Sequence, residues 1–161
     1  MDEKNQYMNN TPGDTGAVQA DRSQSQGGIV LAVIGSLIAI AGSFMPIFSI
    51  SILGVKKSVT GMQGDFLIFS CIGIAIILLA LLRATKGENK KIAAVIGGGA
   101  AVIEAAVHYA YINQRAATAF SLGSRTIDIS GLINMEIGFY LMIIGGILLF
   151  AAGGFLPSKK K

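Results

Sequence analysis

The sequence predicts an all-α membrane protein, a bundle of four transmembrane helices, and two observations carry that prediction. The first is that four long apolar runs fill about half of the 161 residues, at 29–50, 66–82, 92–112 and 137–156. Each run approaches the ~20 residues that a helix needs to cross the hydrocarbon core of a bilayer. The second is composition, since 52% of the residues are hydrophobic and only 14% are charged. We therefore expect one compact bundle with no second globular domain.

Composition also divides the chain into three parts. Residues 1–27 are rich in Asn, Gln, Ser, Gly and Asp, and they cannot bury enough apolar surface to offset the entropy lost on ordering. We therefore expect residues 1–27 to be a disordered cytoplasmic tail, residues 28–157 the transmembrane domain and residues 158–161 a basic cytoplasmic tail. The N-terminal stretch does not resemble a signal peptide, so the first run is expected to remain in the mature protein.

The distribution of Lys and Arg sets the expected orientation, because cytoplasmic loops carry the excess of positive residues. Nine of the 13 positive residues fall on the side of the two termini and four on the other. The larger group is Lys4, Arg22, Arg83, Lys86, Lys90, Lys91, Lys159, Lys160 and Lys161, and the smaller is Lys56, Lys57, Arg115 and Arg125. We expect a multi-pass protein of the cell (plasma) membrane with both termini cytoplasmic, and no nucleic-acid partner.

The two outer loops contain alternating apolar and polar residues. Residues 48–52 and 57–60 alternate on either side of Gly54, which predicts a short hairpin. Residues 125–130 alternate as well. We expect these segments to pair into a small β-like extracellular cap; an irregular loop is the alternative.

The chain also contains a short internal match that predicts a tandem two-span repeat. Val59-Thr60-Gly61-Met62 precedes Asp65 and the second run, and Ile129-Ser130-Gly131-Leu132 precedes Glu136 and the fourth. An acid at the start of a helix is favoured by the helix dipole, so cap chemistry explains part of the match.

Small residues recur at helical spacing in three of the runs. In a bilayer the hydrophobic effect does not drive helices together, and small residues allow the close backbone contact that does. We therefore expect these positions to form helix–helix seams. They are Gly28, Gly35 and Gly42; Ala93, Gly97, Ala101 and Ala105; and Gly138, Gly145, Gly146, Ala152 and Gly153.

The third run contains the strongest candidate for a site. Glu104 and His108 stand four residues apart and share a helix face, which continues to Arg115 at the outer end. Asp65 and Glu136 begin the neighbouring helices at the same outer level, so the five side chains could form one cluster. A charged Glu104 facing lipid would be costly, so it should face protein or water.

Two interpretations of this cluster are open. It could handle protons or cations, or hold a divalent metal, although one His with scattered carboxylates is a weak metal pattern. Alternatively it is a buried polar network that fixes helix register and is satisfied by Ser36, Ser43, Tyr109 or Tyr111.

The single cysteine, Cys71, lies within a span and cannot form an intramolecular disulfide. No catalytic motif is present, so we expect no enzyme activity, cofactor or metal.

Two stretches resemble a loose group of small bacterial four-span membrane proteins. One is Phe44-Met45-Pro46, followed by the alternating loop and Val59-Thr60-Gly61. The other is Ile137-Gly138-Phe139-Tyr140-Leu141, which runs into Gly145-Gly146 and Gly153-Gly154. The topology is also similar to that of the claudin and peripheral-myelin proteins, but the Trp residues and paired Cys of the claudin loop are absent. Neither resemblance implies a defined activity.

The function that we expect is therefore contact within the lipid bilayer, through a protein partner or a homo-oligomer. The protein would be an accessory subunit, a scaffold or a protective, immunity-type protein. The alternative is a small oligomeric transporter or channel that uses Glu104 and His108. A membrane-permeabilising protein is a third interpretation, and the long outer loops fit it less well.

Overall fold

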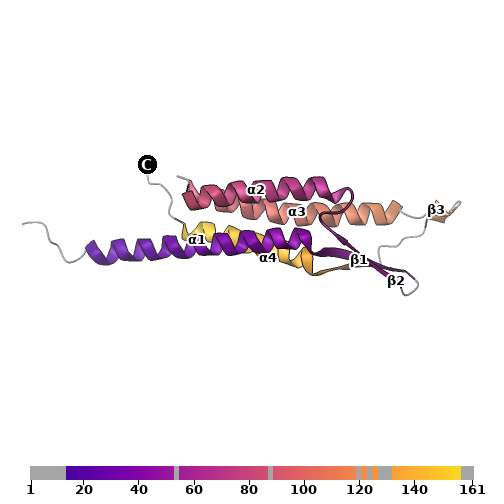
Figure 1. The fold of residues 1–161 in the computed structure, drawn as a ribbon, viewed down its shortest axis with the longest axis horizontal. Helices are drawn as coiled ribbons and strands as arrows, with labels where there is room; N and C mark the ends of the chain where they lie inside the picture. The colour runs from indigo at the N-terminus through magenta and orange to yellow at the C-terminus, as the bar shows by residue number, and fades with distance from the viewer. Residues whose placement is uncertain are drawn as a thin grey trace, which may run out of the picture.

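The computed structural model contains four long helices with a small β-sheet at one end (Figure 1). It describes residues 14–52, 55–86, 89–118, 121–122, 125–126 and 132–156. The helices are α1 (Asp14–Phe44), α2 (Phe66–Lys86), α3 (Lys90–Thr118) and α4 (Ile137–Phe155).

Each helix contains a segment long and apolar enough to cross a membrane, so the prediction of four helices of membrane-spanning length is confirmed. The four segments are Gln26–Phe44, Phe66–Lys86, Lys90–Arg115 and Ile137–Phe155. The first ends six residues before the predicted boundary at residue 50. Pro46 has no N–H to donate to a continuing helix, and the chain turns into a strand there.

The helix α1 also begins earlier than expected. It is helical from Asp14, so the prediction of a disordered tail is wrong for residues 14–27. This stretch includes Ala17, Gln19 and Ala20, which favour helix, and an existing apolar helix supplies the nucleus from which it can extend. Residues 1–13 lie outside the described part of the chain.

The helices form two layers, with α2 and α3 in one and α1 and α4 in the other (Figure 1). The helix α4 packs extensively on both α1 and α3, whereas α2 packs mainly on α3 and less on α1. The well-packed core of the bundle therefore runs along α4, and α2 is the most weakly held helix.

The predicted small-residue seams are where the helices meet. A Cβ at Gly35 would lie 2.7 Å from the backbone nitrogen of Leu149 and 2.8 Å from the carbonyl oxygen of Gly145. A Cβ at Gly42 would lie 2.8 Å from the carbonyl oxygen of Gly138. At these positions the backbones themselves are in contact, which maximises dispersion between helices.

The cap at the end of the bundle is a three-stranded antiparallel sheet of order β2-β1-β5. Its strands are β1 (Pro46–Ile52), β2 (Val55–Thr60) and β5 (Ile133–Met135). The predicted hairpin in the first outer loop is confirmed.

The third strand of the sheet is not the segment that was predicted. Phe48 pairs with Met135 and Ile50 with Ile133, so this strand lies closer to α4 than the predicted residues 125–130. The N-terminus of α4 packs against the end of α1 at Gly42, which places the residues just before α4 beside β1. The strand β4 (Arg125–Thr126) pairs instead with β3 (Ser121–Leu122), and residues 127–130 lie outside the described chain.

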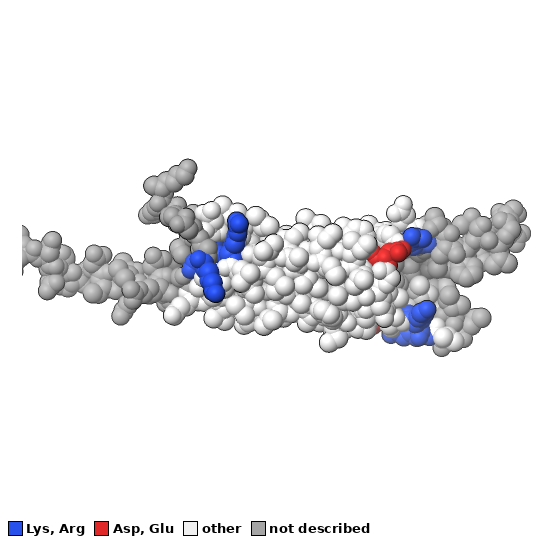
Figure 2. Space-filling view, turned by 45° about the horizontal axis from the view of Figure 1, so that its top comes forward, with Lys and Arg blue, Asp and Glu red and all other residues white. Residues whose placement is uncertain are grey.

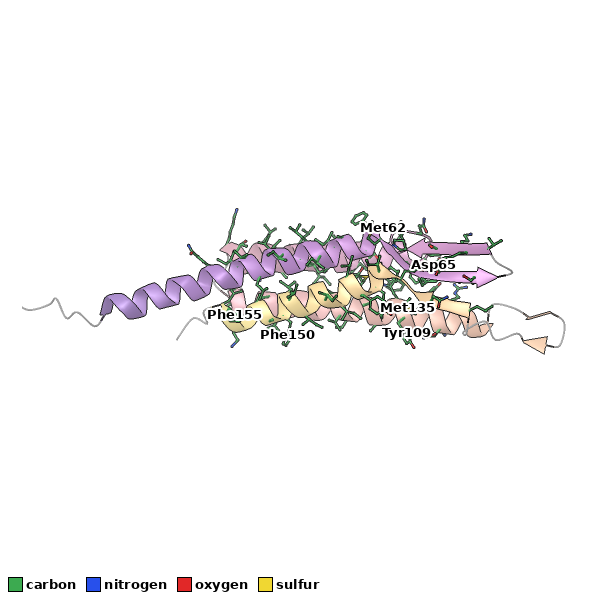
Figure 3. The ribbon with its side chains drawn as sticks, turned by 90° about the horizontal axis from the view of Figure 1, so that it is seen from below. Met62, Asp65, Tyr109, Met135, Phe150 and Phe155 are labelled. Atoms are coloured by element: carbon green, nitrogen blue, oxygen red, sulfur yellow. The ribbon has the colours of Figure 1, made fainter. Side chains whose placement is uncertain are left out.

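Charged side chains gather at the two ends of the bundle. The face in Figure 2 shows Lys and Arg near both ends with an uncharged band between them. In Figure 3, Phe150 and Phe155 lie toward the end where α4 finishes, and Asp65 and Met135 lie near the cap. The tandem repeat stays a prediction, because residues 129–131 of the second copy are not among those described.

Candidate intramembrane site around Glu104

Glu104 lies inside the bundle near the middle of α3. It is 14 residues from Lys90 and 11 from Arg115, which corresponds to about 21 Å and about 16 Å along a helix. The residue is only 5% exposed. Its neighbours Ala101 and Ala105 belong to the two hydrophobic clusters that fill the two halves of the bundle, so Glu104 stands at their boundary.

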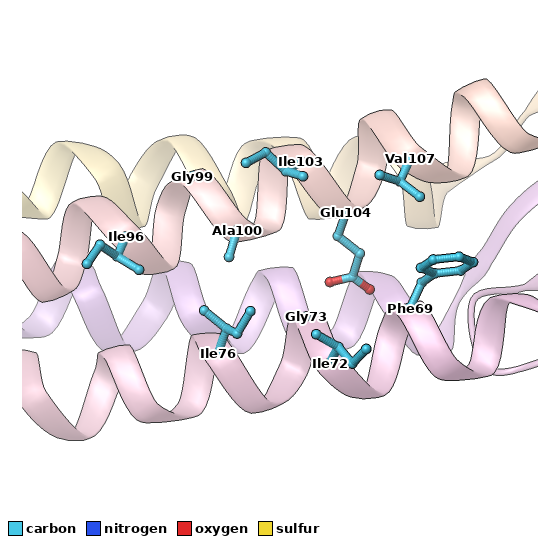
Figure 4. A pocket seen from close by; sticks show the side chains of 10 residues that line it. All are labelled: Phe69, Ile72, Gly73, Ile76, Ile96, Gly99, Ala100, Ile103, Glu104 and Val107. Atoms are coloured by element: carbon cyan, nitrogen blue, oxygen red, sulfur yellow. The ribbon is translucent and has the colours of Figure 1, made fainter.

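Three helices build the immediate surroundings of the carboxyl group. The hydroxyl of Ser43, in the last turn of α1, donates a hydrogen bond to Glu104 Oε1 at 3.1 Å. A Cβ at Gly73 of α2 would collide with Glu104 Oε2, so the carboxyl occupies space that only glycine leaves (Figure 4). Oε2 itself is buried and has no hydrogen-bond partner among the described residues.

His108 is fully buried one turn further along α3. Its Nε2 lies 3.3 Å from the hydroxyl of Ser70 on α2, and its ring packs 5.0 Å from that of Phe66. Ser70 also lies near the Glu104 carboxyl. The side chains of Glu104 and His108 are therefore linked through Ser70 of α2 rather than bonded directly to each other.

A groove between α2 and α3 opens beside the Glu104 carboxyl. Its volume is about 460 Å³. Large apolar side chains form its rim, and several of them, such as Ile72 and Ile103, are exposed on the outside of the bundle. The groove is lined by Phe69, Ile72, Gly73, Ile76, Ile96, Gly99, Ala100, Ile103, Glu104 and Val107 (Figure 4).

Asp65 and Arg115 lie apart from Glu104, at the ends of α2 and α3 nearest the cap. Arg115 Nη2 is 3.2 Å from the Asp65 carboxylate, and Arg115 Nε donates to the hydroxyl of Tyr111 at 3.0 Å. The Tyr111 hydroxyl in turn donates to Asp65. Both charged side chains are 67% exposed, so the pair contributes little to stability, ~0–1 kcal/mol.

Glu136 belongs to a third group, on the cap. Lys56 Nζ lies 2.6 Å from Glu136 Oε1, and the hydroxyl of Ser49 donates to the same oxygen at 2.6 Å. The Lys56 hydrogen bond, supported by that from Ser49, holds the pKa of the Glu136 carboxyl below its usual value. Through these contacts Glu136 joins β2, β1 and the start of α4.

The five predicted residues therefore do not form a single cluster. Glu104 and His108 share a buried site, Asp65 pairs with Arg115, and Glu136 pairs with Lys56. The sequence placed them at comparable levels along the helices, but level alone does not give the direction of each side chain around the bundle axis.

The sequence analysis missed Ser70 and Gly73, although α2 carries a signal that points to them. Its buried residues recur at alternating spacings of four and three. Because the rest of α2 is almost uniformly apolar, only the small and polar residues in this series mark the inward face. The series is Phe66, Ser70, Gly73, Ile77, Ala80 and Ala84.

Replacing Glu136 with Gln is expected to lower amide protection in β1 and β5, because it removes the negative charge that binds Lys56 and accepts the hydrogen bond from Ser49. A carboxyl with a depressed pKa in the folded state stabilises that state above its ordinary pKa of 4.5, and loses the effect as the pH falls through the folded value. Hydrogen exchange should therefore separate wild type and Glu136→Gln at neutral pH. The difference should vanish in acid, and an equal difference at every pH would contradict this role.

The arrangement around Glu104 can accept a hydrogen bond or a positive charge inside an apolar surrounding. Within the described ranges, no group of three or more His, Cys, Asp or Glu side chains is placed to hold a metal ion. No protein-family model matches the chain, and no curated protein matches its sequence, so its function is inferred from the site and the packing.

Proposed function

We propose that the chain is an integral protein of the cell membrane that acts, without enzymatic activity, through contacts with another membrane protein. It would span the bilayer four times with both termini in the cytoplasm. It would serve as an accessory subunit, a scaffold or a protective, immunity-type protein.

The distribution of buried polar side chains carries this proposal. Among the described residues, Ser43, Ser70 and His108 lie in the half of the bundle next to the cap, Glu104 lies at the inner boundary of that half, and Ser49 lies in strand β1 of the cap. The other half is filled by small and aliphatic side chains, which support a closed core rather than a polar path from end to end. That cluster includes Ala32, Ile77, Ala94 and Leu149. Ser36, the remaining buried hydroxyl, bonds to the carbonyl of Ala32 in its own helix.

The helix α2 is the surface that we assign to the partner. It is the least buried of the four candidate spans, and Ile68 and Leu79 are 66% and 62% exposed. A photo-crosslinking residue at Leu79 should capture a specific membrane protein in cells, whereas the same residue at the fully buried Leu149 should not. Purification in mild detergent should yield the same partner. A homo-oligomer without other chains would contradict the proposal.

Transport is the second candidate, because Glu104, whose buried Oε2 has no partner among the described residues, lines a groove that opens to the outside of the helices. In that case a small oligomeric transporter or channel would use Glu104 and His108. Glu104→Gln should then abolish proton-coupled flux in proteoliposomes while the protein stays folded and inserted.

The proposed orientation predicts which ends of the bundle an impermeant thiol reagent can reach. In a background lacking Cys71, Lys57→Cys in the cap should be labelled in intact cells and Lys159→Cys only after permeabilisation. The reason is the excess of positive residues on the side of the termini. Labelling of Lys159→Cys in intact cells would reverse the orientation.

A further inference from the structure

The groove between α2 and α3 is a feature that the packing of the bundle does not explain. Its volume of about 460 Å³ lies in the range of sites that take small molecules. Nine of the ten residues that line it are apolar or glycine, and the tenth is Glu104. The groove therefore has the size to hold a largely apolar small molecule, and it provides one polar group, Glu104, for that molecule to bind.

The second observation is the state of the Glu104 carboxyl. Its Oε1 accepts a hydrogen bond from Ser43, but its Oε2 is buried, has no partner among the described residues and points toward Gly73 at the groove (Figure 4). A buried polar atom left without a partner is costly and calls for an explanation. A ligand that brings a positive charge or a donor to Oε2 supplies one.

The charges around the groove indicate which sign the ligand carries. The basic side chains described on α2 and α3 lie at the helix ends, at Arg83, Lys86, Lys90, Lys91 and Arg115, and none lines the groove. His108 is turned toward Ser70 and Phe66. Glu104 therefore has no positive partner from the protein, and a cationic ligand is the one that would favour the ionised carboxylate.

The depth of Glu104 excludes a lipid headgroup as the source of that cation. The carboxyl lies about 16–21 Å along α3 from either charged end, near the middle of a hydrocarbon core of about 30 Å. Headgroups stay at the interface, so the ligand must itself partition into the apolar interior.

We propose that the α2–α3 groove binds a lipophilic cation, a molecule with one ammonium- or phosphonium-type charge on an apolar body. It would enter sideways from the bilayer and pair its charge with Glu104. The proposal rests on the membrane embedding proposed above. Ligand binding is measured on the purified chain without a partner, so cross-linking at Leu79 and ligand binding can fail separately.

The test uses the full chain in lipid nanodiscs and two probes of the same shape and opposite charge, tetraphenylphosphonium and tetraphenylborate. Labelled tetraphenylphosphonium should bind saturably, and tetraphenylborate should not compete. Glu104→Gln keeps the shape and the Ser43 hydrogen bond but removes the charge, so affinity should fall at least about tenfold.

Two glycine variants separate the groove from general effects on folding. A Cβ at Gly99, which lines the groove, or at Gly154 meets no atom within 4 Å, so both positions accept a larger residue. Gly99→Leu should fill the groove and abolish binding, whereas Gly154→Leu should bind as wild type does.

Three results would overturn the proposal. The first is equal binding of both probes, which is simple partition into lipid. The second is unchanged affinity in Glu104→Gln. The third is a protein that co-purifies with wild type and is lost in Gly99→Leu, without any phosphonium binding, because the groove would then hold a partner helix.

Discussion

Gly145→Val should destabilise the folded bundle by about 3 kcal/mol or more, at the upper end of the cost of overpacking a core. A Cβ at Gly145 would meet the backbone of Ala39 on α1 and lie 2.6 Å from the carbonyl oxygen of Gly35. These atoms belong to a helix backbone, so no rotamer change can relieve the overlap. The two helices would have to separate, and the whole α1–α4 seam would lose its dispersion contacts.

The matched control is Gly154→Val on the same helix. A Cβ there meets nothing within 4 Å, so the substitution changes the same chemical groups without the overlap. Unfolding in mixed detergent micelles should show a large loss for Gly145→Val and a change within ~0.5 kcal/mol for the control. Equal losses in the two variants would mean that a general effect of replacing a helical glycine with valine, and not the overlap at the seam, causes the loss of stability.

The seams were predictable because they depend on local spacing alone. Gly35 and Gly42 lie seven residues apart on α1, and Gly138 and Gly145 lie seven apart on α4, so each pair shares one face of its own helix. That geometry does not depend on the rest of the fold. The four spans were predictable for a similar reason, since length and hydropathy are sums over adjacent residues.

The cap and the site were only partly predictable, because they depend on how distant segments meet. The alternation in β1 and β2 can be seen in the sequence. The third strand, however, pairs with β1 because α4 contacts α1 near Gly42, and no local sequence pattern encodes that contact. In the same way Glu104 stood out as a carboxyl in an apolar run. Ser43 was one of four candidate partners, and only tertiary packing selects it. Gly73, which leaves space for the carboxyl, comes from α2 and was not predicted.

The structure also changes what is expected when Glu104 is replaced by an apolar residue. If Glu104 and His108 were bonded to each other, removing Glu104 would leave His108 unpaired and cost stability. Instead His108 lies beside Ser70, and the carboxyl carries a buried oxygen without a partner among the described residues. Removing such a group relieves a desolvation penalty.

Glu104→Met should therefore stabilise the folded protein, by ~1–3 kcal/mol. Methionine is unbranched and similar in length, so it can occupy the same space beside Gly73 without a polar atom to desolvate. Ser43 loses its acceptor, but a helical serine can donate to the carbonyl four residues earlier, as Ser36 does to Ala32. The measurement is unfolding in mixed micelles beside Glu104→Gln, which keeps a polar group and should not gain the same stability.

A gain in stability would mean that the Glu104 carboxyl lowers the stability of the wild-type fold. Glu104→Met should in that case also lose activity or ligand binding. A stability–function trade of this kind is typical of groups that are kept for what they bind rather than for how they pack. A loss above ~1 kcal/mol in Glu104→Met that Glu104→Gln avoids would show the opposite. The hydrogen bond from Ser43 would then be holding α1 to α3, and Glu104 would be a structural group of the bundle.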